Sequence, residues 1–111
     1  MAQKTSLILA TLTIVATAPL TIHRFATSVG AVPAAGAWCP GVANDNYESG
    51  EPAGVVTHGV MLVESGAAVA ADAAVQADSS GRAITLGAGV ALGRTLDEAT
   101  GAGELIRVKL A

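Results

Sequence analysis

The sequence predicts an all-β protein: a small single-domain barrel or paired-sheet (β-tulip-like) fold with an extended N-terminal strand and at most a short helix. Three observations support this fold class. Small apolar residues alternate with glycine-centred turns through the second half of the chain, as in short strands joined by tight turns. Residues 105–110 alternate with a period of two, which is typical of a strand with one wet face. The length of 111 residues fits one domain.

The N-terminal segment is predicted to be a strand over residues 7–16. Many of its residues are β-branched, and a period of two places Ile8, Leu12 and Ile14 on one face. The segment also imitates a secretory signal, because Lys4 precedes an apolar run that ends in Ala-Thr-Ala. Threonines inside the run favour the strand. The run is too short and too polar to cross a membrane.

This interpretation gives the chain an extended arm over residues 1–20 and a compact β domain over residues 21–111, within one domain overall. A secreted or periplasmic β-rich binding module, with a cleaved N-terminal signal peptide, is the alternative. The mass of the mature chain would separate the two, because cleavage near Ala18 would shorten it.

The middle of the chain predicts turn-rich segments and one long strand. Pro19 ends the first strand, and a second apolar run follows over residues 20–29. Glycines and prolines punctuate residues 30–41. Residues 44–52 form the most polar segment and predict a surface loop. Residues 54–63 are rich in valine and predict a strand.

The second half predicts a hairpin and two further strands. The hairpin turn has the sequence Asp-Ser-Ser-Gly, in which glycine suits a positive φ. The expected elements are strands at 75–77 and 82–86 around the turn 78–81, a short strand at 89–96, a turn at 97–103 with one helical turn left open, and a final strand at 104–110. Residues 65–77 stay open between a helix, which their alanines favour, and short strands around a turn.

The composition limits both the core and the function. Aromatic residues make up only 3% of the chain, alanine and valine supply most of the apolar fraction, and 13 glycines oppose folding entropically. We therefore expect stability to be shared with neighbouring molecules. The net charge of −3 and the scattered basic residues argue against nucleic-acid binding. The single cysteine excludes an intramolecular disulfide and a cysteine-based zinc site.

No residue pattern predicts catalysis, a cofactor site or a metal site. His23 and His58 have no partners at suggestive spacing, so an enzyme would need one of them to meet a distant carboxylate. The acidic residues of the loop 44–52 lack the spacing of a calcium loop. Glycines 87–93 lack the spacing of a nucleotide fingerprint. Cys39 has no basic neighbour and is expected to be a packed thiol.

Two long stretches carry a family resemblance. ESGAAVAADAAVQADSSGRAIT and GRTLDEATGAGELIRVKL, together with the apolar N-terminal run, resemble the small capsid cement (head decoration) proteins of tailed bacteriophages. The resemblance covers residues 5–110 and depends on the order and spacing of glycines and valines rather than on a catalytic signature. The Trp-Cys-Pro loop at 38–40 and the length of the N-terminal apolar run depart from the expected pattern.

The resemblance implies a structural protein of the virion, made in the host cytoplasm, on the outer surface of the capsid. Such proteins bind the major capsid protein of an assembled shell, commonly as homotrimers at three-fold and quasi-three-fold junctions, and cross-link its subunits against the pressure of packaged DNA. For this chain we expect no cofactor, no nucleic-acid partner and no membrane.

The expected contact residues are apolar side chains exposed before docking. They are Leu7, Leu9, Leu12 and Ile14 on the N-terminal strand, which could add to a sheet edge of the capsid protein, and Trp38 in its loop. For Trp38, a role as the plug of the domain's own core is equally open, because a lone tryptophan suits either place.

Overall fold

The computed structural model describes residues 4–110 as eight strands without a helix. The strands are β1 (Leu7–Val15), β2 (Phe25–Ala26), β3 (Gly41–Ala43), β4 (Pro52–Glu64), β5 (Ala74–Ala77), β6 (Ala83–Thr85), β7 (Gly93–Thr95) and β8 (Leu105–Leu110). The predicted all-β class is confirmed. No helix of these residues could therefore span a membrane.

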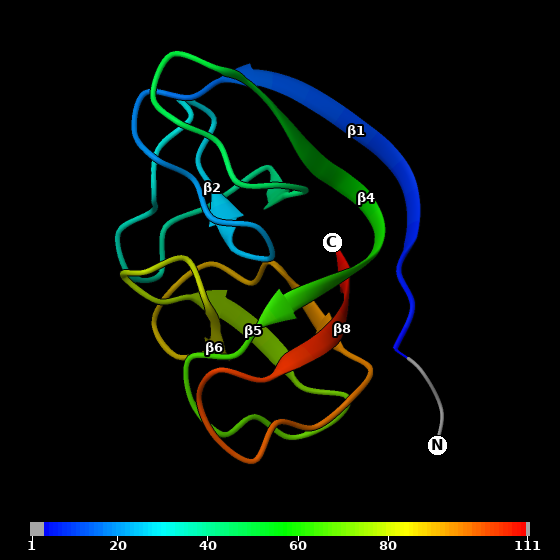
Figure 1. Cartoon of the computed structure of the whole chain (residues 1–111). Helices are drawn as coiled ribbons and strands as arrows, with labels where there is room; N and C mark the ends of the chain where they lie inside the picture. The colour runs from blue at the N-terminus through cyan, green and yellow to red at the C-terminus, as the bar shows by residue number, and fades with distance from the viewer. Residues whose placement is uncertain (1–3, 111) are drawn as a thin grey trace.

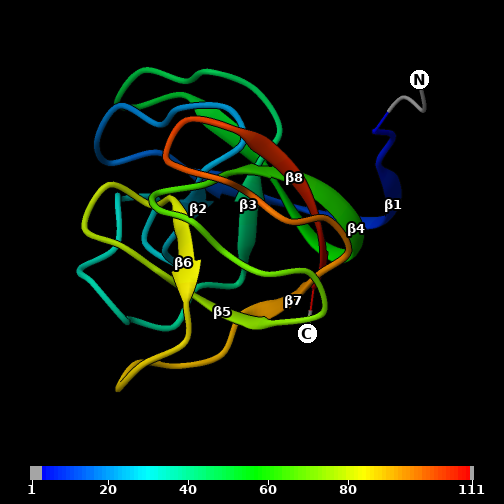
Figure 2. The same cartoon turned by 90° about the horizontal axis from the view of Figure 1, so that it is seen from below.

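The strands form one antiparallel sheet that curls into a nearly closed barrel (Figures 1 and 2). The order is β2-β3-β4-β8-β7-β5-β6, and β1 pairs with β4 outside this path. A parallel bridge between Ser65, just after β4, and Ala83 of β6 joins the last strand of this order back to β4, so that β4, β8, β7, β5 and β6 form a ring. Closure of this kind covers strand edges that would otherwise be open.

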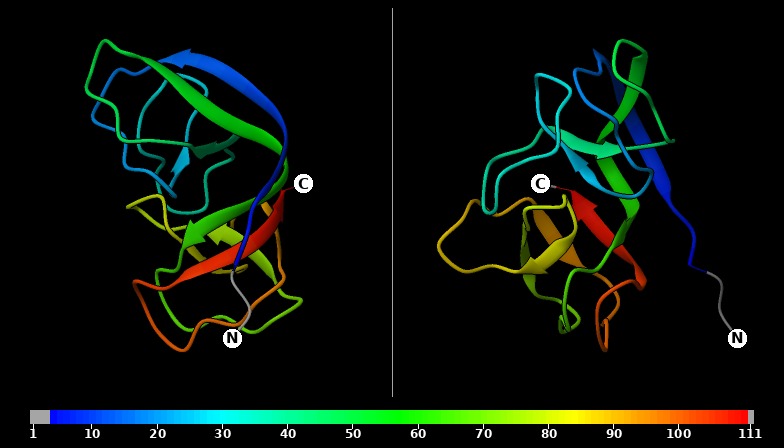
Figure 3. Two further views of the ribbon diagram at one scale, coloured as in Figure 1. Left: turned by 45° about the vertical axis from the view of Figure 1, so that its right-hand side comes forward. Right: turned by 60° about the vertical axis from the view of Figure 1, so that its left-hand side comes forward.

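β4 is the long curved strand that connects the two halves of the molecule (Figure 3). Its first part pairs with β1 and with β3, and its last five residues pair with β8. Gly59 has a φ of +110° and lies where the register between β4 and β1 is irregular. A Cβ at Gly59 would collide with the Leu7 carbonyl oxygen and crowd Leu9. The glycine therefore lets β1 lie close against β4 at this position.

Two clusters of buried side chains fill the interior. The larger one occupies the barrel, and its fully buried members include Val63, Val75, Ile106 and Val108. The smaller one lies between the first part of β4 and the segments after β1, and consists mainly of alanine with Leu20 and Val55. Both are made from short side chains, as the composition predicts, so the area buried per residue is modest.

Several sequence predictions are confirmed. The strands expected at 7–16, 54–63 and 104–110 are present as β1, β4 and β8. In β8 the side chains of Ile106, Val108 and Leu110 are buried and those between them face outward.

The predicted hairpin is also present. β5 and β6 pair from Val75 opposite Thr85 to Ala77 opposite Ala83. One carboxylate oxygen of Asp78 accepts hydrogen bonds from the amides of Ser80 and Arg82, both at 2.8 Å. This Asx-type geometry stabilises the turn.

The structure decides one prediction that the sequence left open and shortens one predicted strand. Residues 65–77 form no helix: they consist of turns followed by β5. The strand expected over 89–96 is shorter, since only Gly93–Thr95 pairs as β7. The residues before it form a loop that Gln76 holds, because its side-chain oxygen accepts hydrogen bonds from the amides of Gly87 and Gly89.

An ion pair holds the turn between β7 and β8. Both carboxylate oxygens of Asp97 accept from the Arg107 guanidinium, at 2.9 and 3.0 Å, and one also accepts from the Arg107 amide at 2.9 Å. Hydrogen bonds from the Arg107 side chain are the main cause of a lowered pKa at Asp97, from 3.8 to about 2. Charge-assisted, two-pronged pairs of this kind are the stronger class of hydrogen bond.

This ion pair predicts a specific acid sensitivity. Because the folded-state pKa of Asp97 is depressed, its stabilisation is complete above pH ~4 and is lost as the pH falls towards about 2. We expect Asp97→Asn to lower the free energy of unfolding at pH 7 by about 1 kcal/mol, allowing for screening by solvent. The difference between wild type and variant in denaturant titrations should shrink between pH 4 and pH 2. A difference independent of pH over this interval would contradict the assignment.

Candidate functional site

β1 lies on the outside of the molecule as an edge strand (Figures 1 and 3). Among residues 4–110 it pairs only with β4, from Leu7 opposite Val60 to Val15 opposite Pro52, with irregular register around Ala10. The other edge of β1 has no strand partner within this part of the chain. Such an edge presents backbone donors and acceptors that can pair with an added strand.

Three of the four strand residues expected to make contacts are exposed. The side chains of Leu7, Leu9 and Leu12 are 60%, 70% and 49% accessible. Ile14 differs, because it lies opposite Ala53 and packs against the smaller core cluster. The Ile14 side chain therefore helps to stabilise the fold of its own chain.

Other exposed apolar residues of β1 were not anticipated as contacts. Ile8 and Val15 are also exposed. A strict inside–outside alternation would hide one face of the strand. Most of β1 is exposed on both of its faces, so the side chains that point to either side of the strand stay accessible. The density of apolar residues in the run was the signal that could have identified them.

Trp38 lies on the surface, with 59% of its area accessible, so the role of core plug is wrong. It lines a surface hollow of about 440 Å³ that β1, β4 and the loop before β3 form together. The hollow is lined by Ala10, Thr11, Leu12, Trp38, Pro40, Thr57 and His58. The fold thus brings Leu12 and Trp38, two of the expected contact residues, to one feature of the surface.

Cys39, next to Trp38, points the other way. Its side chain is buried in the larger core cluster, and its thiol lies 3.8 Å from the Ala37 carbonyl oxygen. Burial raises the pKa of the thiol from 9.0 to about 11. A thiol with so high a pKa is a poor nucleophile at neutral pH, as expected for a packed thiol.

The two histidines have different surroundings. The His58 ring is exposed and lies 2.9 Å from the Thr57 hydroxyl. His23 has a φ of +65° and a buried Nδ1 without a hydrogen-bond partner among residues 4–110. Within the same residues, no group of three or more histidine, cysteine or acidic side chains is placed to hold a metal ion.

Most arginines are engaged in ion pairs. Glu64 accepts from Arg24 at 3.2 Å and lies 3.8 Å from Arg82, which also pairs with Asp78 at 3.3 Å. These pairs are partly buried and tie the end of β4 to the β5–β6 hairpin and to the segment before β2. With the Arg107 pair, they account for three of the four arginines, and their role is structural.

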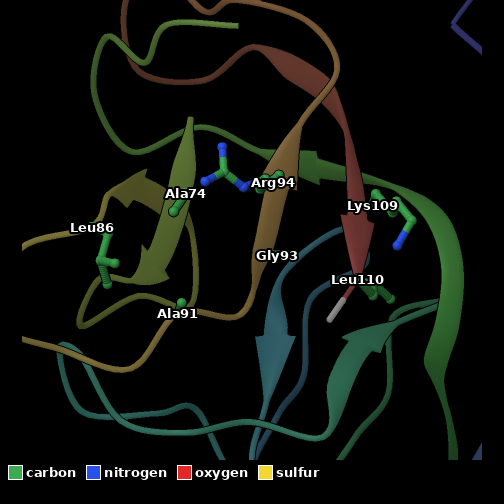
Figure 4. A pocket seen from close by; sticks show the side chains of 7 residues that line it. All are labelled: Ala74, Leu86, Ala91, Gly93, Arg94, Lys109 and Leu110. Carbon is green, nitrogen blue, oxygen red and sulfur yellow. The ribbon is translucent and has the colours of Figure 1, made fainter. Parts of the chain in front are cut away.

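A second hollow, of about 470 Å³, lies at the surface beside β5, β7 and β8 (Figure 4). Its walls are mostly apolar and come from β5, β7, β8 and the loops beside them. Two cationic side chains, Arg94 on β7 and Lys109 on β8, also line it. The full lining is Ala74, Leu86, Ala91, Gly93, Arg94, Lys109 and Leu110. The alternation in the last strand predicted that Lys109 faces outward, but no sequence pattern predicted that Arg94 lies beside it.

Comparisons with known proteins identify a family and a similar fold. Residues 9–110 match the family model described as phage cement protein. The fold is similar to the crystal structure of the N base of head fiber gp8.5 in bacteriophage phi29, with a TM-score of 0.74, 17% sequence identity, and coverage of 92% of this chain and 93% of that chain. At this identity the likeness shows the fold alone. No curated protein matches the chain.

The fold and the family match together define a small all-β structural protein of the phage virion, associated with the capsid. The chain belongs to the phage cement protein family, as the sequence resemblance indicated.

Proposed function

We propose that this protein is a non-enzymatic decoration protein that binds the outer surface of the assembled phage head. There it contacts more than one subunit of the major capsid protein and so stabilises the shell against the pressure of packaged DNA. Three copies act together as a homotrimer. Neither a cofactor nor nucleic acid takes part.

One observation carries the binding role: the exposed apolar side chains of β1 lie beside an unpaired strand edge and next to the Trp38 hollow. The edge offers main-chain hydrogen bonds to a strand of the capsid protein, and Leu7, Leu9 and Leu12 offer apolar area. Trp38 is the residue type most often found to anchor an interface. A soluble monomer gains nothing from exposing such a surface unless a partner covers it.

Repetition explains how a small interface can stabilise a large shell. Each copy has only a short strand and a few apolar side chains to offer, so its affinity for a single site is expected to be modest. A homotrimer that engages several capsid subunits gains from effective concentration, because the second and third contacts form within one assembly. Contacts between copies would also bury further apolar surface, which a core of alanine and valine side chains supplies only modestly.

The test is reconstitution on native shells. Purified protein is mixed with expanded heads that lack it, the heads are pelleted, and the particles are imaged by cryo-electron microscopy. We expect saturable co-sedimentation and added density at regular outer positions, with β1 and Trp38 against the shell. Shells decorated in this way should also release DNA at a higher temperature than bare shells. Absence of binding to heads of its own phage would overturn the proposal.

A further inference from the structure

The hollow on the barrel contains an arrangement that strands usually avoid. Arg94 and Lys109 are direct partners in the register between β7 and β8. Both are exposed, while Thr95 and Val108, next to them in sequence, are buried. Direct partners project to the same face of a sheet, so the two cationic side chains leave the sheet side by side and then turn apart, Arg94 towards Ala74 and Lys109 away from it (Figure 4). Like charges in this position destabilise a sheet.

Nothing among residues 4–110 neutralises this pair. Arg24, Arg82 and Arg107 each have a carboxylate partner. Arg94 instead donates a hydrogen bond to the backbone carbonyl of Asp72, at 2.8 Å, and Lys109 has no side-chain hydrogen bond to this part of the chain. Two like charges at paired strand positions, with no carboxylate partner in the fold, are typical of a functional position.

The surroundings of the pair suit a ligand that is part apolar and part acidic. Ala74 lies opposite Arg94 on β5, and the apolar side chains of Leu86, Ala91 and Leu110 also line the hollow (Figure 4). Apolar walls reduce solvent screening, so a carboxylate that enters the hollow is held more strongly than one on an open surface. The hollow therefore fits a short acidic peptide segment.

The chain itself presents such a segment on its other half. The loop between β3 and β4 exposes Asp45, Glu48 and Glu51, and none of the three forms an ion pair within residues 4–110. Their polar contacts are local: Asp45 accepts from the Asn46 amide, and Glu51 accepts from the Glu48 amide. Figure 1 places this loop at the top of the molecule, beyond β2 and β3, and β8 in the lower half.

We propose that the Arg94–Lys109 hollow receives the acidic loop, residues 44–52, of a second copy of this chain. The complementary surfaces lie on different parts of one chain, so each copy can give its loop to one neighbour and accept the loop of another. Such head-to-tail contacts generate a ring when the rotation closes. The inference rests on the self-association in the proposed function and assigns the surfaces that make it.

The test is a charge exchange followed by measurement of mass in solution. Two variants of the full chain reverse one surface each: Arg94→Glu with Lys109→Glu, and Asp45→Lys with Glu48→Lys and Glu51→Lys. A third variant combines all five substitutions. Light scattering after gel filtration gives the mass, and circular dichroism confirms that each variant is folded. Because the substituted residues are exposed, the fold is expected to persist.

We expect the wild type to assemble in a salt-sensitive manner, each single-surface variant to be monomeric, and the combined variant to assemble again. Lys4→Glu is the control for reversal of a lysine charge outside the hollow, and it should leave the mass unchanged. A monomeric wild type, an unchanged mass in both single-surface variants, or a combined variant that stays monomeric would overturn the inference. Capsid binding, measured separately by co-sedimentation, tells a failure of this inference from a failure of the capsid role.

Discussion

Gly59→Ala should destabilise the protein by about 3 kcal/mol and release the start of β1. At a φ of +110° an alanine is strained, at a cost of about 1–2 kcal/mol. Its Cβ would also collide with the Leu7 carbonyl oxygen and press on the Leu9 amide, both of which belong to β1. The strand that must move is the edge strand, so the barrel should stay folded. A shift in Tm of roughly 10 °C or more follows for a chain of this size.

The matched control for this change is Gly50→Ala. Gly50 has a φ of +93° but nothing lies within 4 Å of the position that its Cβ would take. It therefore reports the cost of the backbone conformation without the collision. Denaturant unfolding should show Gly59→Ala to be the more damaging by about 1–2 kcal/mol, and hydrogen exchange should show faster exchange at β1 amides in that variant alone. Equal destabilisation by the two alanines would contradict the proposed role of Gly59.

Because the proposed capsid contact includes β1, the Gly59→Ala variant should also bind shells more weakly. The loss follows from disorder of the strand before docking, since an ordered edge costs less entropy to bind. Weaker binding by this variant would show that the capsid protein needs β1 as an ordered strand. Unchanged binding would show that only the side chains of β1 matter.

Trp38→Ala should lower the affinity for the capsid by roughly 30-fold or more, as expected for an interface anchor worth about 2 kcal/mol. Leu12→Ala, in the same hollow, should have a smaller effect in the same direction. The free energy of unfolding should change by less than about 0.5 kcal/mol in either variant, because both side chains are largely exposed. Co-sedimentation with shells at graded concentrations gives the affinity, and thermal unfolding gives the stability.

Leu96→Ala is the control for these two substitutions. Leu96 is an exposed apolar residue in the turn after β7, outside the Trp38 hollow. Its replacement should leave capsid affinity unchanged. Normal binding by Trp38→Ala, or an equal loss with Leu96→Ala, would show that the hollow is not the contact surface. The two measurements together would also reveal whether Trp38 acts by supporting the fold, since affinity and stability would then fall in parallel.

Much of the fold was predictable because its causes are local. The Asp78 turn follows from a side chain that hydrogen-bonds to its own backbone, and the period of two in 105–110 assigns one face of β8 to the core. The family follows from the order of glycines and valines along nearly the whole chain. Exposure of Leu7 and Leu9 was also foreseen, since an apolar run at one end of a chain with a thin core has little to pack against.

Other features needed partners distant in sequence. The alanines of residues 65–77 suit a helix or a strand, and pairing with β6 and β7 makes residues 74–77 a strand, while the residues before them form turns. The position of Trp38 depended on the size of the barrel interior, which valine and alanine side chains already fill. Ile14 was expected at the surface, yet it packs inward because Ala53 stands opposite it.

The sequence by itself determined the all-β class, the turns, the outward and inward faces of the last strand, and the family. Each of these depends on residues that are neighbours along the chain or on their order. Only the tertiary structure decided that β1 has a free edge, that Leu12 and Trp38 line one hollow, and that Arg94 stands beside Lys109. These depend on which strands pair and in what register, and pairing is chosen by the packing of the whole barrel rather than by any local segment.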